Sequence, residues 1–126
     1  MVSKEQKTKE LIERITRERG FTRGWHKLLA ERDPDFMEAY HHAATIAFRD
    51  GKLPRKYKEI IAIVMDALTY YEDGLRVHVR NALKLGVTEE EILEALEVTA
   101  LLSIHHLSVH LPALIDESEK YKKGQA

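Results

Sequence analysis

Hydrophobic residues recur at a helical spacing along nearly the whole chain of 126 residues. Apolar positions three and four residues apart give each segment one core-facing side, whereas half-buried strands would alternate strictly between apolar and polar residues. No alternating stretch competes with the helical spacing. The sequence therefore predicts an all-α protein, a bundle of about six helices forming one domain over residues 1–126.

Capping residues mark where the predicted helices begin and end. Gly20 ends a charged N-terminal helix within residues 1–20, and Asp33 followed by Pro34 opens another helix. Thr88 and Glu91 form a capping box, an acceptor oxygen three residues before a carboxylate. On the helix from Pro54 to about Tyr70, we expect the core face to hold Tyr57, Ile60, Ile61, Val64, Ala67 and Leu68. Two further helices cover 88–102 and the stretch to about Lys120, and the tail 121–126 is expected to fray.

The charge balance excludes some partners. The formal net charge of −1 gives no basic excess with which to bind nucleic acid. The first twenty residues are too charged for a signal peptide, and we expect no apolar span that crosses a bilayer. These features predict a cytoplasmic protein that binds neither nucleic acid nor membrane.

The chain contains no cysteine. Disulfides, thiolate metal sites and thiol redox chemistry all require sulfur from this residue. The function must therefore use oxygen and nitrogen groups.

Glu59 lies among the isoleucines at 60, 61 and 63. A carboxylate in such surroundings loses hydration, so it needs a cation or a hydrogen-bond donor if it is buried. The alternative is an exposed glutamate on the boundary of the apolar face.

His78 belongs to an apolar stripe with Leu75, Val79 and Ala82, while Arg76 and Arg80 take the opposite face. Its imidazole is thus predicted to point toward the interior or an enclosed cavity. A histidine in this position is either a core residue with a hydrogen-bond partner or an acid–base group, since imidazole exchanges protons near neutral pH.

Two strings carry a family resemblance: KYKEIIAIVMDAL and, after a short gap, GLRVHVRNALKLGVTEEEILEAL. Their order resembles the carboxymuconolactone decarboxylase family over about residues 53–114. The resemblance implies the all-helical fold of the alkyl hydroperoxidase D proteins. It also implies assembly as a homo-oligomer, a trimer or hexamer, with sites at or near subunit contacts.

The peroxidase branch of this superfamily places two cysteines between a glutamate and a histidine. By spacing, the glutamate corresponds to Glu59, the cysteines to Tyr71 and Gly74, and the histidine to His78. Because neither sulfur position holds sulfur, the resemblance excludes a thiol peroxidase. It implies a decarboxylase-like enzyme in which Glu59 and His78 transfer protons.

His105, His106 and His110 depart from the family pattern. His106 and His110 lie one helical turn apart, a spacing that suits a divalent metal such as zinc, nickel or iron, with His78 and Glu59 as further candidate ligands. Pro112 disturbs the helix close to this pair. The alternatives are a metal-free pocket, in which these histidines and Tyr71 contact substrate, and a surface role.

Three functions fit the sequence. The first is a decarboxylase-like enzyme that acts by proton transfer on a small carboxylated or lactone-type substrate. The second is an oligomeric protein that binds a ligand or metal in a histidine-rich pocket without turnover. In the third, Glu59 and His78 serve only as each other's polar partners in the interior of a structural assembly.

Overall fold

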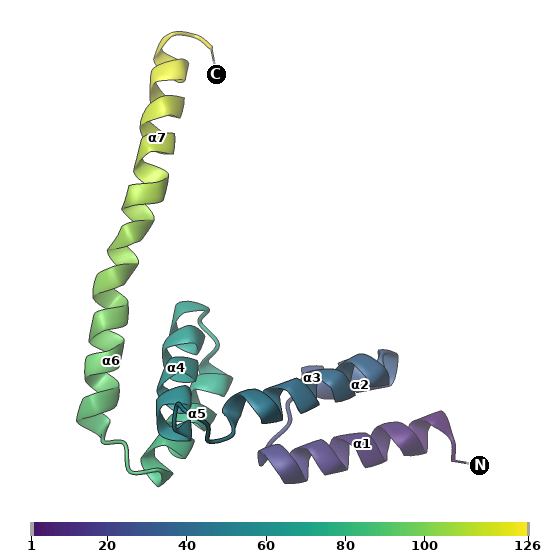
Figure 1. Cartoon of the computed structure of the whole chain (residues 1–126). Coiled ribbons are helices and arrows are strands. Elements are labelled where there is room, and N and C mark those ends of the chain that lie inside the picture. Colours follow the sequence, from purple (N-terminus) through teal and green to yellow (C-terminus); the bar gives the residue numbers. More distant parts are fainter. Residues whose placement is uncertain (1, 126) are drawn as a thin grey trace. The chain divides into compact units, whose positions relative to one another are not determined.

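The computed structural model describes residues 2–125, and every regular element in that range is a helix. The order of the elements (Figure 1) is α1 (Lys4–Arg19), α2 (Gly24–Arg32), α3 (Pro34–Phe48), α4 (Arg55–Leu68), α5 (Glu72–Lys84), α6 (Glu89–Leu102), the short 3₁₀ helix η1 (Ser103–His105) and α7 (His106–Lys122). The predicted all-α class is confirmed. The fraying predicted for residues 121–126 was wrong for Tyr121 and Lys122, which belong to α7, while Ala126 lies outside the described residues.

The chain divides into two compact units, Met1–Gly51 and Lys52–Ala126. Each unit is described by itself below. The single domain over 1–126 stays a prediction.

The first unit contains α1, α2 and α3. Gly20 closes α1 with a φ of 89°, and the Asp33 side chain caps α3 by accepting from the Phe36 N–H at 3.1 Å. Both caps agree with the sequence, because a cap depends on residues within one turn of the helix end. The core of this unit consists of Leu11, Ile15, Ala30 and Met37, with Ile12 and Leu29 packed against it.

The second unit is built on α4, which packs along α5 and also contacts α6. Its core consists of Ile63, Ala82, Val87 and Ile92, with Ile60, Leu75, Val79 and Leu96 packed around it. The predicted capping box opens α6: the Glu91 N–H donates to the Thr88 hydroxyl and the Thr88 N–H to the Glu91 carboxylate. This box sets the start of α6 directly after the buried Val87.

The buried face of α4 differs from the predicted one. Tyr57, Ile61 and Leu68 are exposed in the single chain, whereas Glu59 and Ile63 are fully buried. The prediction was wrong for Tyr57, Ile61 and Leu68, because α5 packs against the side of α4 that carries Glu59 and Ile63, at the edge of the apolar stripe and not at its middle.

The turn between α4 and α5 is a Schellman motif. The Tyr71 N–H donates to the Asp66 carbonyl at 2.8 Å, and the Tyr70 N–H donates to the Ala67 carbonyl at 3.3 Å. Tyr70 has a φ of 55°, in the left-handed region that glycine usually supplies at this position. The motif ends α4 and brings Tyr71 to the first turn of α5.

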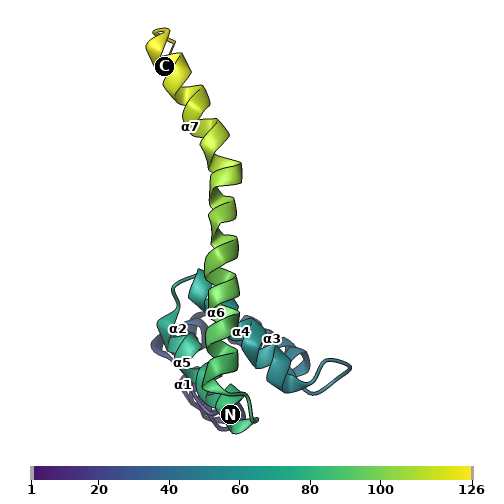
Figure 2. The ribbon, with the colours of Figure 1, turned by 90° about the vertical axis from the view of Figure 1, so that its left-hand side faces the viewer.

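Helices α6 and α7 continue through η1 as one rod (Figure 2). Residues 89–122 form a helical stretch that is long and apolar enough to cross a membrane by length and composition alone, with a window of mean hydropathy 1.5 and none of that window buried. The expectation that the chain has no such span was therefore wrong. Its large apolar side chains are exposed, among them Leu101, Ile104, Leu107, Val109, Leu111 and Leu114.

Candidate functional site

The centre of the candidate site is a carboxylate–imidazole pair between α4 and α5. Glu59 Oε2 lies 2.6 Å from His78 Nδ1, although the two residues are 19 positions apart in sequence. Glu59 is fully buried, and the side chain of His78 is 17% exposed. The structure thus brings together the two residues that the sequence singled out, and one of them keeps access to solvent.

Two further donors face the carboxylate of Glu59. The Arg55 Nε–H donates to Oε1 at 3.2 Å, and the Asn81 amide lies 3.4 Å from the same oxygen. A carboxylate accepts hydrogen bonds and does not donate them, so His78 donates to Glu59 through Nδ1–H. Neither Arg55 nor Asn81 was predicted from the sequence as a donor. Their spacing is a usable signal, because Arg55 is one turn before Glu59 and Asn81 nearly one turn after His78.

A second carboxyl, Asp66, lies on the other side of the imidazole. Its Oδ2 is 3.9 Å from His78 Nε2. Burial raises the pKa of Asp66, and the nearby His78 opposes part of that rise. No role was predicted for Asp66 from the sequence, although it lies seven residues after Glu59 and hence on the same face of α4.

Tyr71 and Gly74, at the two positions where peroxidases carry cysteine, lie beside this pair. Tyr71 is half-buried at the start of α5, and Gly74 is buried in its first turn. A Cβ on Gly74 would lie 2.8 Å from the Tyr71 ring and 2.5 Å from Asp66 Oδ2. The space near the first position is thus occupied by a phenol, and the second position must stay small.

The other predicted histidines lie on the exposed rod. His105 ends η1, while His106 and His110 are in the first turns of α7 with ring centroids 6.5 Å apart. Within residues 2–125, no group of three or more His, Asp, Glu or Cys side chains is placed to hold a metal ion. The predicted ligand set of Glu59, His78, His106 and His110 is therefore not assembled in the single chain.

His106 instead borders an apolar groove of about 600 Å³ between α4 and the rod. The groove is lined by Val64, Leu68, Ala95, Val98, Thr99, Leu102, Ser103 and His106. Its walls suit an apolar ligand, and the imidazole supplies a polar group at its edge.

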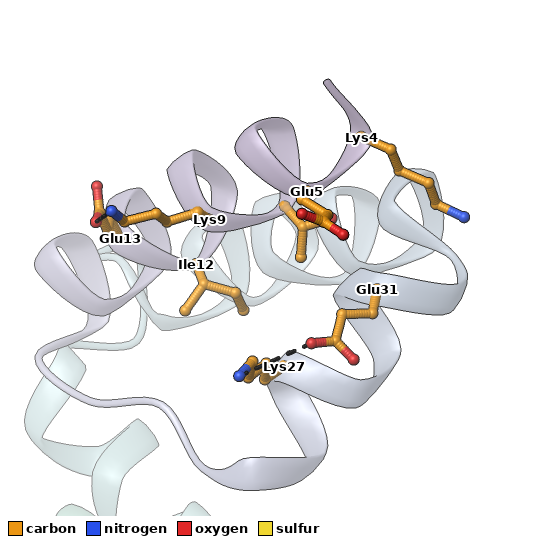
Figure 3. Close-up of a pocket in the computed structure, with 8 residues that line it drawn as sticks. Lys4, Glu5, Lys9, Ile12, Glu13, Lys27 and Glu31 are labelled. Carbon is orange, nitrogen blue, oxygen red and sulfur yellow. Dashed lines mark ion pairs between the residues drawn. The ribbon is translucent and has the colours of Figure 1, made fainter. Parts of the chain in front are cut away.

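The first unit carries a hollow of about 520 Å³ between α1 and α2 (Figure 3). It is lined mainly by exposed charged side chains, and two ion pairs join residues of the same helix there, Lys9–Glu13 and Lys27–Glu31. Exposed pairs of this kind contribute little free energy and leave the charges solvated. This hollow lacks the buried, interacting groups seen around Glu59, so it is not the candidate site.

A sequence profile described as the carboxymuconolactone decarboxylase family matches residues 34–103. The match includes Glu59, Asp66, Tyr71, Gly74 and His78 and covers more than half of the chain. The chain belongs to this family. The resemblance read from the two sequence strings is thereby confirmed.

Two relatives of this carboxymuconolactone decarboxylase family protein have names that describe them as uncharacterized. The chain is 32% identical over 63 residues to the uncharacterized protein 4 in the cox locus of Paracoccus denitrificans, covering 50% of this chain and 57% of the relative. It is 30% identical over 70 residues to an uncharacterized protein of Cupriavidus necator, covering 56% and 62%. The chain thus matches about three fifths of the length of each relative. No solved structure matches it.

Proposed function

We propose that this protein is a thiol-free enzyme that transfers a proton to or from a small carboxylated or lactone-type substrate through Glu59 and His78. The observation that carries the proposal is the 2.6 Å contact between a fully buried carboxylate and an imidazole that reaches solvent. The Glu59 carboxylate orients the ring through Nδ1, and the second nitrogen, Nε2, meets the substrate.

The chemistry follows from this arrangement. When the bond between a substrate carbon and its carboxylate breaks, carbon dioxide leaves and the bonding electron pair stays in a dienolate. A proton from His78 Nε2 then bonds to that carbon, and the neutral ring takes up another proton that comes ultimately from water. Glu59 keeps the ring in this orientation throughout, because Arg55 and Asn81 hold its second oxygen. In this proposal Tyr71 contacts the substrate's carboxylate or carbonyl.

The test is loss of the ultraviolet absorbance of an unsaturated lactone acid, measured with purified protein. We expect turnover that falls about 100-fold or more in His78→Gln. A matched control is His42→Gln, which changes an exposed histidine in the first unit and should leave the rate unchanged. Equal turnover in wild type and His78→Gln would overturn the role assigned to His78.

The groove beside His106 supports a second candidate, a protein that binds an apolar ligand or a divalent metal without turnover. Equilibrium dialysis with zinc, nickel or iron and titration with a fluorescent fatty acid distinguish the two ligands. Metal or probe bound stoichiometrically by wild type and lost in His106→Ala, without turnover of the lactone acid, would favour this function. Absence of both kinds of binding would remove it.

We also propose that copies of this chain assemble into a cytoplasmic homo-oligomer, a trimer or hexamer. Apolar side chains are exposed on two surfaces of the second unit, the rod and the outer face of α4 around Ile61 and Met65. A soluble protein rarely leaves so much contiguous apolar surface in water. A second copy that presents the same two surfaces would cover both.

A further inference from the structure

Asp66 lies next to His78, but the proton transfer proposed above gives it no role. The imidazole of His78 lies between two carboxyl groups, with Glu59 at Nδ1 and Asp66 at Nε2. Glu59 has donors from Arg55, Asn81 and His78. Asp66 Oδ2, by contrast, is buried and accepts no hydrogen bond from any part of the chain that the structure describes. Of the two carboxyl groups that flank the ring, Glu59 therefore has three hydrogen-bond donors and Asp66 Oδ2 has none among the described residues.

Gly74 creates the room for this second carboxyl. A Cβ at position 74 would lie 2.5 Å from Asp66 Oδ2, a separation that real Cβ contacts do not reach. The backbone of Gly74 is ordinary helix within α5, so no left-handed conformation demands a glycine here. The absent side chain is thus a steric requirement of the Asp66 carboxyl. The position that holds a sulfur in the peroxidase branch here makes space for an oxygen.

Burial and charge decide where the protons reside. An ionised carboxylate without donors is costly to bury, whereas one with three donors is stabilised. His78 faces Glu59 at Nδ1 and Asp66 at Nε2, Glu59 also pairs with Arg55, and the Tyr71 phenol adds a titratable group in the turn. Glu59 and Arg55 neutralise each other, so they do not favour a second negative charge. The buried Asp66 Oδ2, which has no donor among the described residues, therefore favours the protonated form of this carboxyl.

We propose that Asp66 shares one proton with His78 Nε2 and acts as the store from which His78 is reprotonated. This inference rests on the proposed proton-transfer function. In the transfer, the Asp66 O–H bond breaks, its electron pair stays on Oδ2, and the proton bonds to Nε2. His78 then gives that proton to the substrate carbon, and Asp66 takes another from water through the exposed part of its side chain, which is 20% accessible. The two atoms must approach from 3.9 Å to hydrogen-bond distance, about 2.8 Å.

Asp66 is accordingly a positioning residue, because it acts on the substrate only through His78. Its contribution differs from that of a residue that only packs. It controls the supply of protons and hence the pH at which His78 works, whereas the binding of substrate should not depend on it. A structural role would change stability without moving a titration.

The direct test is a carbon-13 NMR titration of the full chain with labelled aspartate carboxyl groups. We expect the Asp66 resonance to titrate at a higher pH than the exposed aspartates. In His78→Gln the midpoint should move higher still, because the positive charge that opposes the rise has been removed. An ordinary midpoint for Asp66, or one that does not respond to His78→Gln, overturns the inference.

Gly74→Ala tests whether Asp66 holds the proton, while the Asp66 carboxyl itself is kept. The added methyl displaces Asp66 toward water, so its titration midpoint should fall to that of an exposed aspartate. Gly24→Ala is the matched control, since a Cβ there meets no atom of the described chain within 4 Å and should leave the Asp66 midpoint unchanged. A midpoint that stays high in Gly74→Ala also overturns the inference.

Kinetics separates this inference from the proposed function. Asp66→Asn should lower kcat about 10-fold and remove one limb of its pH profile, with KM unchanged. If the titration midpoint of Asp66 is raised and depends on His78 but no turnover is measured, the shared proton is supported and the decarboxylase-like function is refuted. Turnover with an unchanged pH profile in Asp66→Asn would keep the function and refute the role of Asp66.

Discussion

Glu59 and His78 meet at 2.6 Å across the α4–α5 interface, and the carboxylate is fully buried while the imidazole reaches solvent. This relationship makes Glu59 structurally important whatever chemistry His78 performs. Removing one partner of a buried pair leaves the remaining polar groups without compensation, which costs more than the pair contributes.

We therefore predict that Glu59→Ala lowers the free energy of unfolding by about 3 kcal/mol, and Glu59→Gln by about 1–2 kcal/mol because the amide keeps some hydrogen bonds. Urea unfolding followed by circular dichroism measures both. The control is Glu72→Ala, whose side chain is 71% exposed and paired with Arg76, and which should change stability by less than about 0.5 kcal/mol. Equal losses at positions 59 and 72 would contradict the buried pair.

The first unit should lose stability in acid because of His26. Burial, with the nearby charge of Arg19, lowers the pKa of His26 from 6.5 to about 4. Between these two values the unfolded chain binds a proton that the folded chain does not, so stability falls as the pH falls from about 6.5 toward about 4. Below about 4 this contribution is fully lost.

Trp25 reports on this transition, because it is the single tryptophan of the chain and its ring stacks on His26 at 3.7 Å. Urea unfolding followed by its fluorescence at several pH values should give a decline that His26→Gln reduces. His42→Gln, a change at an exposed position of the same unit, should keep the wild-type slope. A slope unaffected by His26→Gln would refute the assignment.

Tyr70 is predicted to destabilise the turn in which it lies. Its φ of 55° is unfavourable for a side chain with a Cβ, and 94% of the residue is exposed, so it gains little from packing. Tyr70→Gly should raise the free energy of unfolding by about 0.5–1 kcal/mol. Tyr121→Gly, at an exposed position with helical backbone, should have the opposite sign. Thermal melts of both variants provide the measurement.

Charged substitutions among the exposed apolar side chains of α7 should change the oligomeric state. Leu107→Glu with Leu111→Glu places two charges on the proposed contact surface, so the oligomer should dissociate into monomers, as measured by light scattering after size exclusion. Lys122→Glu with Lys123→Glu adds charge at the end of the rod and should leave the mass unchanged. A wild-type monomer that floats with neutral lipid vesicles would contradict the oligomer and show that the rod binds lipid.

Local signals in the sequence were sufficient for the helices and for one pair of site residues. Gly20, Asp33 and the Thr88–Glu91 box act within a single turn, so their effects do not depend on distant parts of the chain. Glu59 and His78 were identifiable because each is a polar residue in an apolar pattern, and because their separation matches the family.

Only the tertiary structure decided how α4 is rotated against α5. Packing against α5 selects the rotation that buries Glu59 and Ile63 and leaves Ile61 and Leu68 exposed in the single chain. That rotation places His78 and Asn81 on the Glu59 carboxylate and Asp66 at the second nitrogen of His78, whereas Arg55 reaches Glu59 within α4. Residues far apart in sequence define the site, since side-chain contacts across two helices follow from their relative rotation and not from the spacing within either one.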